Sequence, residues 1–141
     1  MALRRLASLS MSVFVSYASQ DEKWARQLIS ELSEKGIDVW DAQSKLLPGD
    51  NWALEVGKAL GRAQAIIVLV SPAATRSENV RREIEFALAS DRFEGRLIPI
   101  IVKPTTKMPW ILEQLKPLRG TDPSHVSNHV VKRLGAKAAH G

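Results

Sequence analysis

The chain has 141 residues, of which 45% are hydrophobic and 25% charged, a composition typical of one globular domain. Five of the 20 basic residues lie near the ends and the remaining 15 balance the 15 acidic residues, so the net charge of +5 does not indicate a nucleic-acid-binding face. The absence of cysteine excludes disulfides and thiol chemistry.

The two ends of the chain lack the features of targeting or membrane segments. Residues 1–11 contain no sustained apolar run of the kind that a secretion signal needs, and we expect them to be disordered or an upstream extension, with Met11 as an alternative start. No apolar stretch approaches the ~20 residues that span a bilayer. We therefore expect a cytoplasmic domain at 12–138, with no membrane partner and a short tail at 139–141.

The first third of the chain predicts strand, helix, strand and loop in that order. Residues 12–18 (SVFVSYA) are β-branched and aromatic, which favours a strand. Asp21 opens a segment with apolar residues at helical spacing, and Gly36 is suited to end that helix because glycine tolerates the left-handed conformation. Residues 37–40 form a short second strand, and residues 41–51 (DAQSKLLPGDN) form a loop.

The remaining chain continues the alternation of helices and strands. We expect a helix at about 52–62 with Asp50 or Asn51 as its cap, an entirely apolar strand at 65–70, a helix from the cap Ser77 to about Ser90, a strand at 96–102, a short edge strand at 115–118 and a last helix at about 123–138. This order predicts a flavodoxin-like, doubly wound parallel α/β sheet of about five strands with helices on both faces.

Ligands of such sheets bind at the carboxyl ends of the strands, and three common uses of that edge are excluded by inspection. The turn after the first strand, residues 18–21, has no glycine for a dinucleotide fingerprint. There is no P-loop, and Ser71-Pro72 stands where a phosphoacceptor domain would carry an aspartate. His125 and His129 have helical spacing, but no carboxylate or cysteine lies near them in sequence, so no metal is expected.

Two glutamates near the same edge can be separated by helix phase. The helix that contains them has a buried stripe of Val80, Ile84, Ala87 and Leu88. At about 100° per residue Glu83 lies at the border of that stripe, whereas Glu85 points to water. A half-buried carboxylate of this kind is either a catalytic group or a rim residue paired with Arg76 or Arg82.

Five short motifs, in order over most of the chain, resemble the TIR (Toll/interleukin-1 receptor) domain family. They are the first strand and its exit at 13–17, Trp40 with the BB loop that follows it at 46–50, the third strand at 68–72, the fourth at 99–101, and the segment 77–83 that leads to Glu83. The resemblance extends over about 12–138. Within the family, the chain is similar to the standalone bacterial TIR proteins that cleave NAD.

The resemblance implies an NAD+ glycohydrolase or cyclase that breaks the nicotinamide–ribose bond, releasing ADP-ribose or a cyclic form of it. Glu83 would be the catalytic residue, and NAD+ would be the substrate, with no separate cofactor. The substrate-binding positions implied are Ser16, Tyr17, Trp40, Ser71 and Asn79. Asn79 stands where the family usually has tryptophan, and Ala18 where enzymatic relatives often carry arginine. For Tyr17 and Trp40, packing in the core is the alternative.

The family also self-associates through TIR–TIR contacts in which the BB loop takes part. The positions implied are Leu46, Leu47, Pro48, Gly49 and Asp50. In bacterial anti-phage defence the product activates a separate effector protein. The alternative function is a non-catalytic adaptor that acts through TIR–TIR contacts alone.

Overall fold

The computed structural model describes residues 11–140, apart from the side chains at positions 92 and 136–140. Five parallel strands form one sheet in the order β2-β1-β3-β4-β5. They are β1 (Ser12–Ser16), β2 (Asp38–Trp40), β3 (Ala65–Val70), β4 (Leu97–Ile101) and β5 (Leu118–Arg119). This is the flavodoxin-like, doubly wound order, and the predicted fold class is confirmed.

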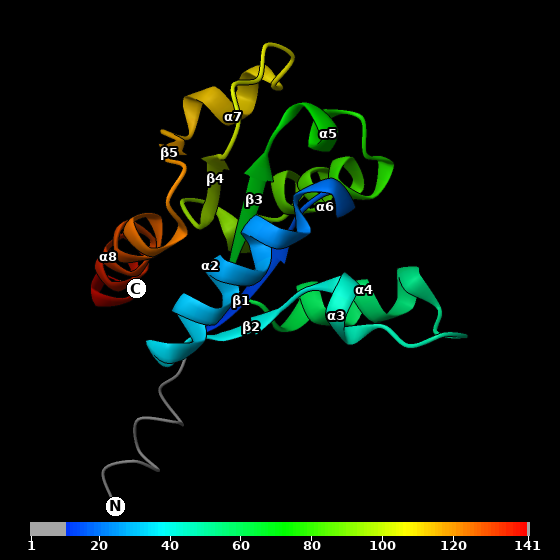
Figure 1. Ribbon diagram of the computed structural model, residues 1–141. Helices are drawn as coiled ribbons and strands as arrows, with labels where there is room; N and C mark the ends of the chain where they lie inside the picture. Colours follow the sequence, from blue (N-terminus) through cyan, green and yellow to red (C-terminus); the bar gives the residue numbers. More distant parts are fainter. Residues whose placement is uncertain (1–10, 141) are drawn as a thin grey trace, which may run out of the picture.

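Helices cover both faces of the sheet (Figure 1). The longer ones are α2 (Glu22–Glu34), α4 (Trp52–Arg62), α6 (Glu78–Ala89) and α8 (Pro123–His140). The cluster that joins α2 and α8 to one face is built on Val13, Ile67 and Leu69, and the cluster that joins α4 and α6 to the other is built on Phe14, Ile66 and Val68. Neighbouring strand residues therefore serve opposite faces, as the two-residue period of a strand requires.

Short elements occupy the carboxyl edge of the sheet. They are the 3-10 helix η1 (Ser19–Asp21) and the one-turn helices α3 (Ala42–Lys45), α5 (Pro72–Thr75) and α7 (Trp110–Gln114), each of which follows the end of a strand. The 3-10 helix η2 (Asp91–Phe93) precedes β4 and so lies at the opposite edge. In Figure 1 the arrowheads of β3 and β4 point toward α5 and α7. In the part of the chain that is described, no helix combines the length and apolarity needed to cross a bilayer.

Local capping explains where the main helices begin and end. Asn51 accepts a hydrogen bond from the Leu54 amide at 3.0 Å and starts α4, while Ser77 accepts one from the Val80 amide at 3.2 Å and starts α6. Gly36 ends α2 with a φ of +85°, the left-handed conformation for which glycine was expected there.

Four boundaries differ from the sequence prediction. Strand β1 ends at Ser16 because η1 follows it closely, and residues 42–45, expected in a loop, form α3 because the Asp41 side chain caps them. The edge strand is Leu118–Arg119 rather than 115–118, since Leu115 ends the unexpected α7. The last helix runs to His140, and the predicted extension at 1–10 lies outside the described residues.

Candidate functional site

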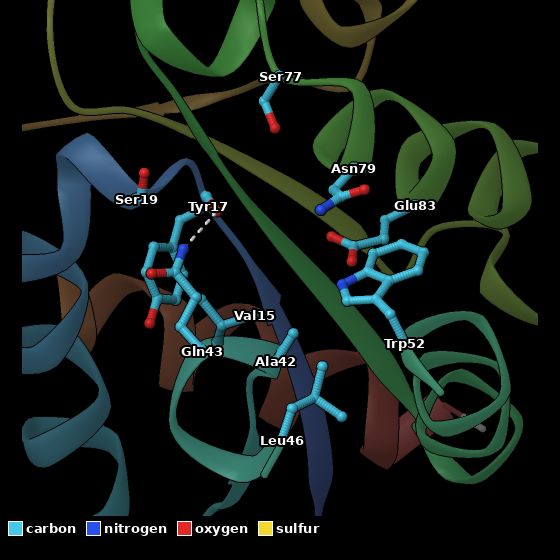
Figure 2. Close-up of a pocket in the computed structure, with 10 residues that line it drawn as sticks. All are labelled: Val15, Tyr17, Ser19, Ala42, Gln43, Leu46, Trp52, Ser77, Asn79 and Glu83. Carbon is cyan, nitrogen blue, oxygen red and sulfur yellow. Dashed lines mark hydrogen bonds between the residues drawn. The ribbon is translucent and has the colours of Figure 1, made fainter. Parts of the chain in front are cut away.

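A cleft of about 410 Å³ lies at the carboxyl edge of the sheet (Figure 2). Its walls come from the exit of β1, from α3, from the start of α4 and from the first two turns of α6. The lining residues are Val15, Tyr17, Ser19, Ala42, Gln43, Leu46, Trp52, Ser77, Asn79 and Glu83. A cavity of this size falls within the range of small-molecule sites.

Glu83 is the buried acidic side chain of this cleft. It is 5% exposed and accepts a hydrogen bond from the Ser16 hydroxyl at 2.5 Å, whereas Glu85 is exposed on the outer face of the same helix. Helix phase therefore separates the two glutamates as predicted. The rim alternative does not describe Glu83, because its carboxylate contacts Ser16 and Arg82 lies 3.8 Å from Glu78 instead.

The prediction that Leu88 belongs to the buried stripe of α6 is wrong. Leu88 is 45% exposed although it was expected in the buried stripe. At about 100° per residue it lies about 80° from Val80, while Glu83 lies about 60° away on the other side. The buried face of α6 is therefore turned toward Glu83 and the cleft.

The environment of Glu83 favours its neutral form. Burial raises the pKa of Glu83 from its ordinary value of 4.5 to about 7, and the hydrogen bond from Ser16 offsets part of that shift. A carboxyl group with this pKa exists in both protonation states near neutral pH. Such a group suits electrostatic or acid–base chemistry in a cleft.

A polar network holds α3 against the exit of β1. The Tyr17 hydroxyl donates to Asp41 Oδ2 at 2.6 Å, and Arg26 Nη2 lies 3.1 Å from the Tyr17 oxygen and 3.3 Å from the same Asp41 oxygen. The Ser44 hydroxyl donates to the other Asp41 oxygen, and Gln43 Nε2 donates to the Tyr17 carbonyl at 3.3 Å. The α3 wall of the cleft is thus tied to the residue that follows β1, through Tyr17, and to α2, through Arg26.

Three of the six predicted catalytic and substrate-binding residues line the cleft: Tyr17, Asn79 and Glu83. Ser16 reaches the cleft through its hydrogen bond to Glu83. Asn79 is exposed one helical turn before Glu83, and Tyr17 is buried with burial raising the pKa of its hydroxyl further above the ordinary value. Tyr17 was expected either to pack in the core or to line the site, and it does both.

The structure places Trp40 and Ser71 outside the cleft lining. The Trp40 ring stacks on Phe14 with centroids 5.2 Å apart, because these two residues are register partners on adjacent strands. Ser71 is fully buried; its hydroxyl donates to Asp21 Oδ2 at 2.5 Å and caps α5. These contacts give both side chains packing and capping roles rather than a position in the cleft.

Trp52 is an aromatic residue of the cleft lining that the sequence motifs did not indicate. It is the first residue of α4, is partly buried and lines the cleft with Glu83. A helix that follows a parallel strand begins near the carboxyl edge, where that strand ends. That rule points to Trp52, the first residue of the helix predicted at about 52–62.

The predicted BB-loop residues extend from the cleft wall to solvent. Leu46 lines the cleft, whereas Leu47 is 68% exposed. A tight turn follows, in which Asp50 accepts a hydrogen bond from the Leu47 amide at 2.8 Å and returns one from its own amide to the Leu47 carbonyl at 3.0 Å. Gly49 has a φ of +92°, which a side chain would disfavour, and Pro48 precedes it.

The histidine pair on α8 lies away from this cleft. His125 and His129 place their Nε2 atoms 3.2 Å apart on the exposed side of that helix. Among the described side chains, no group of three or more potential metal ligands is found.

The chain matches a family model and a relative of known name. The family model described as TIR domain matches residues 13–134. The NAD(+) hydrolase TcpA of Theionarchaea archaeon (strain DG-70-1) is 28% identical over 93 residues, which is 65% of this chain and 28% of the relative. The chain thus spans less than a third of that relative's length.

Solved structures show the same architecture. The TIR domain of the Toll-related receptor TRR-2 from Hydra magnipapillata superposes with a TM-score of 0.72 at 22% identity, covering 89% of this chain and 95% of that one. The TIR domains of the activated Roq1 resistosome superpose with a TM-score of 0.57 at 26% identity, covering 67% of this chain and 60% of that one.

Proposed function

The chain belongs to the TIR domain family, and we propose that it cleaves NAD+ at the nicotinamide–ribose bond with Glu83 as the catalytic residue. The observation that carries the proposal is a buried carboxylate, 5% exposed, in the wall of a cleft at the carboxyl edge of the sheet. The match to a relative named as an NAD(+) hydrolase supports it.

The reaction needs one carboxylate and no proton donor. The bond from ribose C1′ to the pyridinium nitrogen breaks, and its electron pair goes to that nitrogen, so nicotinamide leaves as a neutral molecule. Positive charge then develops on the ribose as an oxocarbenium ion. An ionised Glu83 would stabilise that charge, as carboxylates do in glycoside hydrolysis. Water then adds to C1′ and loses a proton, which gives ADP-ribose.

The remaining polar side chains of the cleft have roles that follow from their positions. Ser16 holds the Glu83 carboxylate through its hydroxyl and so orients it toward the ribose. Ser77 caps α6 and Asn79 lies in its first turn, where helix amide groups favour the negative charge of a pyrophosphate. Tyr17 fixes the opposite wall through Asp41.

The test is NAD+ turnover by purified protein and by Glu83→Gln, with products separated by chromatography. The amide keeps the size of the side chain but cannot carry a negative charge, so nicotinamide release should fall by about 10²- to 10³-fold. Glu85→Gln, exposed on the same helix, is the matched control and should retain full activity. Undiminished turnover by Glu83→Gln would remove Glu83 from the mechanism, and no turnover by concentrated wild-type protein would refute the enzyme proposal.

The product and its use follow as finer parts of the same proposal. Attack on C1′ by a ring nitrogen of adenine instead of water would give a cyclic ADP-ribose signal. We place such a signal in the cytoplasm of a bacterium, in anti-phage defence, where a separate effector protein senses it. Chromatographic comparison with ADP-ribose and cyclic ADP-ribose standards distinguishes the two products.

A second candidate function is a non-catalytic TIR–TIR adaptor. The observation that favours it is Leu47, which is 68% exposed in the BB loop, two residues before Gly49. Loss of self-association by Gly49→Val, together with no NAD+ turnover by the parent protein, would support this function over the enzyme.

A further inference from the structure

We propose that His125 and His129 on α8 together bind one divalent transition metal ion of the class that prefers imidazole, with Zn²⁺ as its representative. This site is separate from the cleft of Glu83 and goes beyond the proposed function. The sequence analysis noted the helical spacing of the two histidines and expected no metal. The arrangement of their rings in the folded helix is the observation that carries the inference.

The backbone that carries the pair is held from the opposite side of α8. Val126 and Val130 each follow one of the two histidines, are at most 1% exposed and pack with α2 over one face of the sheet (Figure 1). His125 and His129 are exposed and lie one helical turn apart. Their rings are therefore presented to solvent from a fixed backbone, so a metal ion can bind without ordering the chain.

The two Nε2 atoms are spaced as two ligands of one ion. They lie 3.2 Å apart. Two nitrogen ligands at about 2.0–2.1 Å from Zn²⁺ are separated by about 3.3–3.4 Å at a tetrahedral angle and by about 2.8–3.0 Å at a right angle. An imidazole nitrogen binds a metal in the plane of its own ring, and these two ring planes cross at 74°. One ion can thus be shared at ordinary bond lengths after a small side-chain adjustment.

A hydrogen bond between the rings is the alternative description of the same distance. In that description the Nε2–H of one ring donates to the Nε2 of the other. Metal binding instead requires both Nε2 atoms to be free of protons, with each remaining proton on Nδ1. The two descriptions predict different responses to added metal and to a substitution that keeps a hydrogen-bonding group.

The donor set selects the class of metal. Neutral imidazole suits Zn²⁺, Ni²⁺ and Cu²⁺, whereas Mg²⁺ prefers oxygen ligands. In the part of the chain that the structure describes, no third protein ligand joins the pair, and Asp122 at the start of α8 accepts a hydrogen bond from the Ser124 amide at 3.1 Å instead. Water would complete the coordination of the ion. Cu²⁺ should bind more tightly than Zn²⁺, as the general order of metal affinities requires.

The test is isothermal titration calorimetry with ZnCl₂, CuCl₂ and MgCl₂, using the full chain without a histidine tag near pH 8, where histidine is largely neutral. It compares the wild type with His125→Ala, His129→Ala and His129→Gln. His140→Ala removes the third histidine of the chain and is the matched control. Because both residues of the pair are exposed and alanine favours helix, the variants should fold as the wild type does, which circular dichroism checks.

We expect the wild type to bind Zn²⁺, to bind Cu²⁺ more tightly and not to bind Mg²⁺. Each substitution in the pair should weaken Zn²⁺ binding at least about 10-fold, since even the outer partners of metal-bound histidines contribute about 10- to 100-fold. His129→Gln should lose as much as His129→Ala, because an amide can replace a hydrogen-bonding partner but is a poor ligand for Zn²⁺. His140→Ala should bind Zn²⁺ as the wild type does.

Three results would overturn the inference. They are no Zn²⁺ binding by the wild type, equal binding by His125→Ala and the wild type, and a loss in His140→Ala as large as the loss in the pair variants. NAD+ takes no part in the measurement. The answer is therefore independent of whether the proposed function holds.

Discussion

Glu83 and Glu85 are two positions apart on α6, yet their surroundings differ completely. Glu85 is exposed, whereas Glu83 is 5% exposed and bonded to Ser16 on β1. Removing a carboxylate from water destabilises its charged form, and here burial outweighs the stabilising hydrogen bond. The raised pKa of Glu83 therefore comes from desolvation, which also makes its ionised form destabilising to the fold.

The pH dependence of the rate follows from the pKa of about 7. Because the ionised form stabilises the oxocarbenium ion, kcat/KM should rise about 10-fold per pH unit below 7 and level off above it. The rise in kcat should lie at lower pH than the rise in kcat/KM, because the cationic ring of bound NAD+ stabilises the ionised carboxylate and so lowers its pKa. Initial rates measured from pH 5 to 9 give the pH profiles of both kcat and kcat/KM. A kcat/KM that falls with rising pH would contradict an ionised Glu83.

The same shift predicts an unusual stability effect. The folded pKa of about 7 lies above the ordinary 4.5, so folded protein binds the proton more tightly and Glu83 loses its stabilising contribution as the pH rises through 7. The loss amounts to about 3 kcal/mol at most. Glu83→Gln, which mimics the neutral acid, should therefore stabilise the protein at pH 8 relative to wild type and much less at pH 5.

Urea unfolding of both proteins at the two pH values measures this difference. Glu85→Gln is the control, since an exposed side chain should give equal effects at both values. A Glu83→Gln variant that is equally destabilised at pH 5 and pH 8 would show that the amide is tolerated poorly for reasons other than charge.

At the scale of elements, the cleft depends on α3, a single turn that cannot be stable alone. Its position comes from Asp41, which caps it and is bonded to Tyr17 and Arg26. The side chain of Asp41 is 2% exposed, so its hydrogen bonds are shielded from water. Since Ala42, Gln43 and Leu46 line the cleft, loss of this anchor would alter one wall of the site.

Asp41→Ala should destabilise the protein by about 2–3 kcal/mol and lower kcat/KM by about 10-fold or more, because the wall near the substrate is no longer held. Asp41→Asn keeps an acceptor for the Tyr17 hydroxyl and should restore much of kcat/KM. Asp38→Ala, exposed on neighbouring β2, should change neither. Chemical denaturation and steady-state kinetics provide the two readouts; equal kcat/KM in Asp41→Ala and wild type would show that α3 is not needed for the site.

At the scale of the whole molecule, the BB loop both lines the cleft and carries an exposed apolar side chain. Leu46 lines the cleft while Leu47 is 68% exposed and Leu54, on the first turn of α4, is 53% exposed. One short segment therefore connects the candidate catalytic site to a surface suited to TIR–TIR contacts. Self-association and activity are expected to be linked through it.

Leu47→Asp should reduce self-association, because a charge replaces the exposed apolar side chain at the contact. Sedimentation over a range of protein concentrations measures the association. NAD+ turnover per molecule should rise with concentration for the wild type and should not rise for Leu47→Asp. Leu88→Asp, another exposed leucine at 45%, is the matched control on α6. Equal association by Leu47→Asp and wild type would exclude the loop from the interface.

The sequence by itself determined the alternation of strands and helices, the parallel sheet and the burial of Glu83 over Glu85. These features depend on the regular spacing at which side chains of a helix or strand point to the same side, and that spacing can be read from the order of apolar and polar residues. It also placed Gly36 at the end of α2, because a left-handed residue is a local requirement.

Only the tertiary structure decided which side chains meet in the cleft. Ser16 and Glu83 are 67 positions apart, Tyr17 and Asp41 are 24 apart, and their hydrogen bonds depend on how distant elements pack. The choice between Trp40 and Trp52 had the same cause, since strand register turned Trp40 onto Phe14 and helix packing brought Trp52 to the cleft. The pKa of Glu83 belongs to this group too, because desolvation is a property of all the surrounding side chains and not of the local sequence.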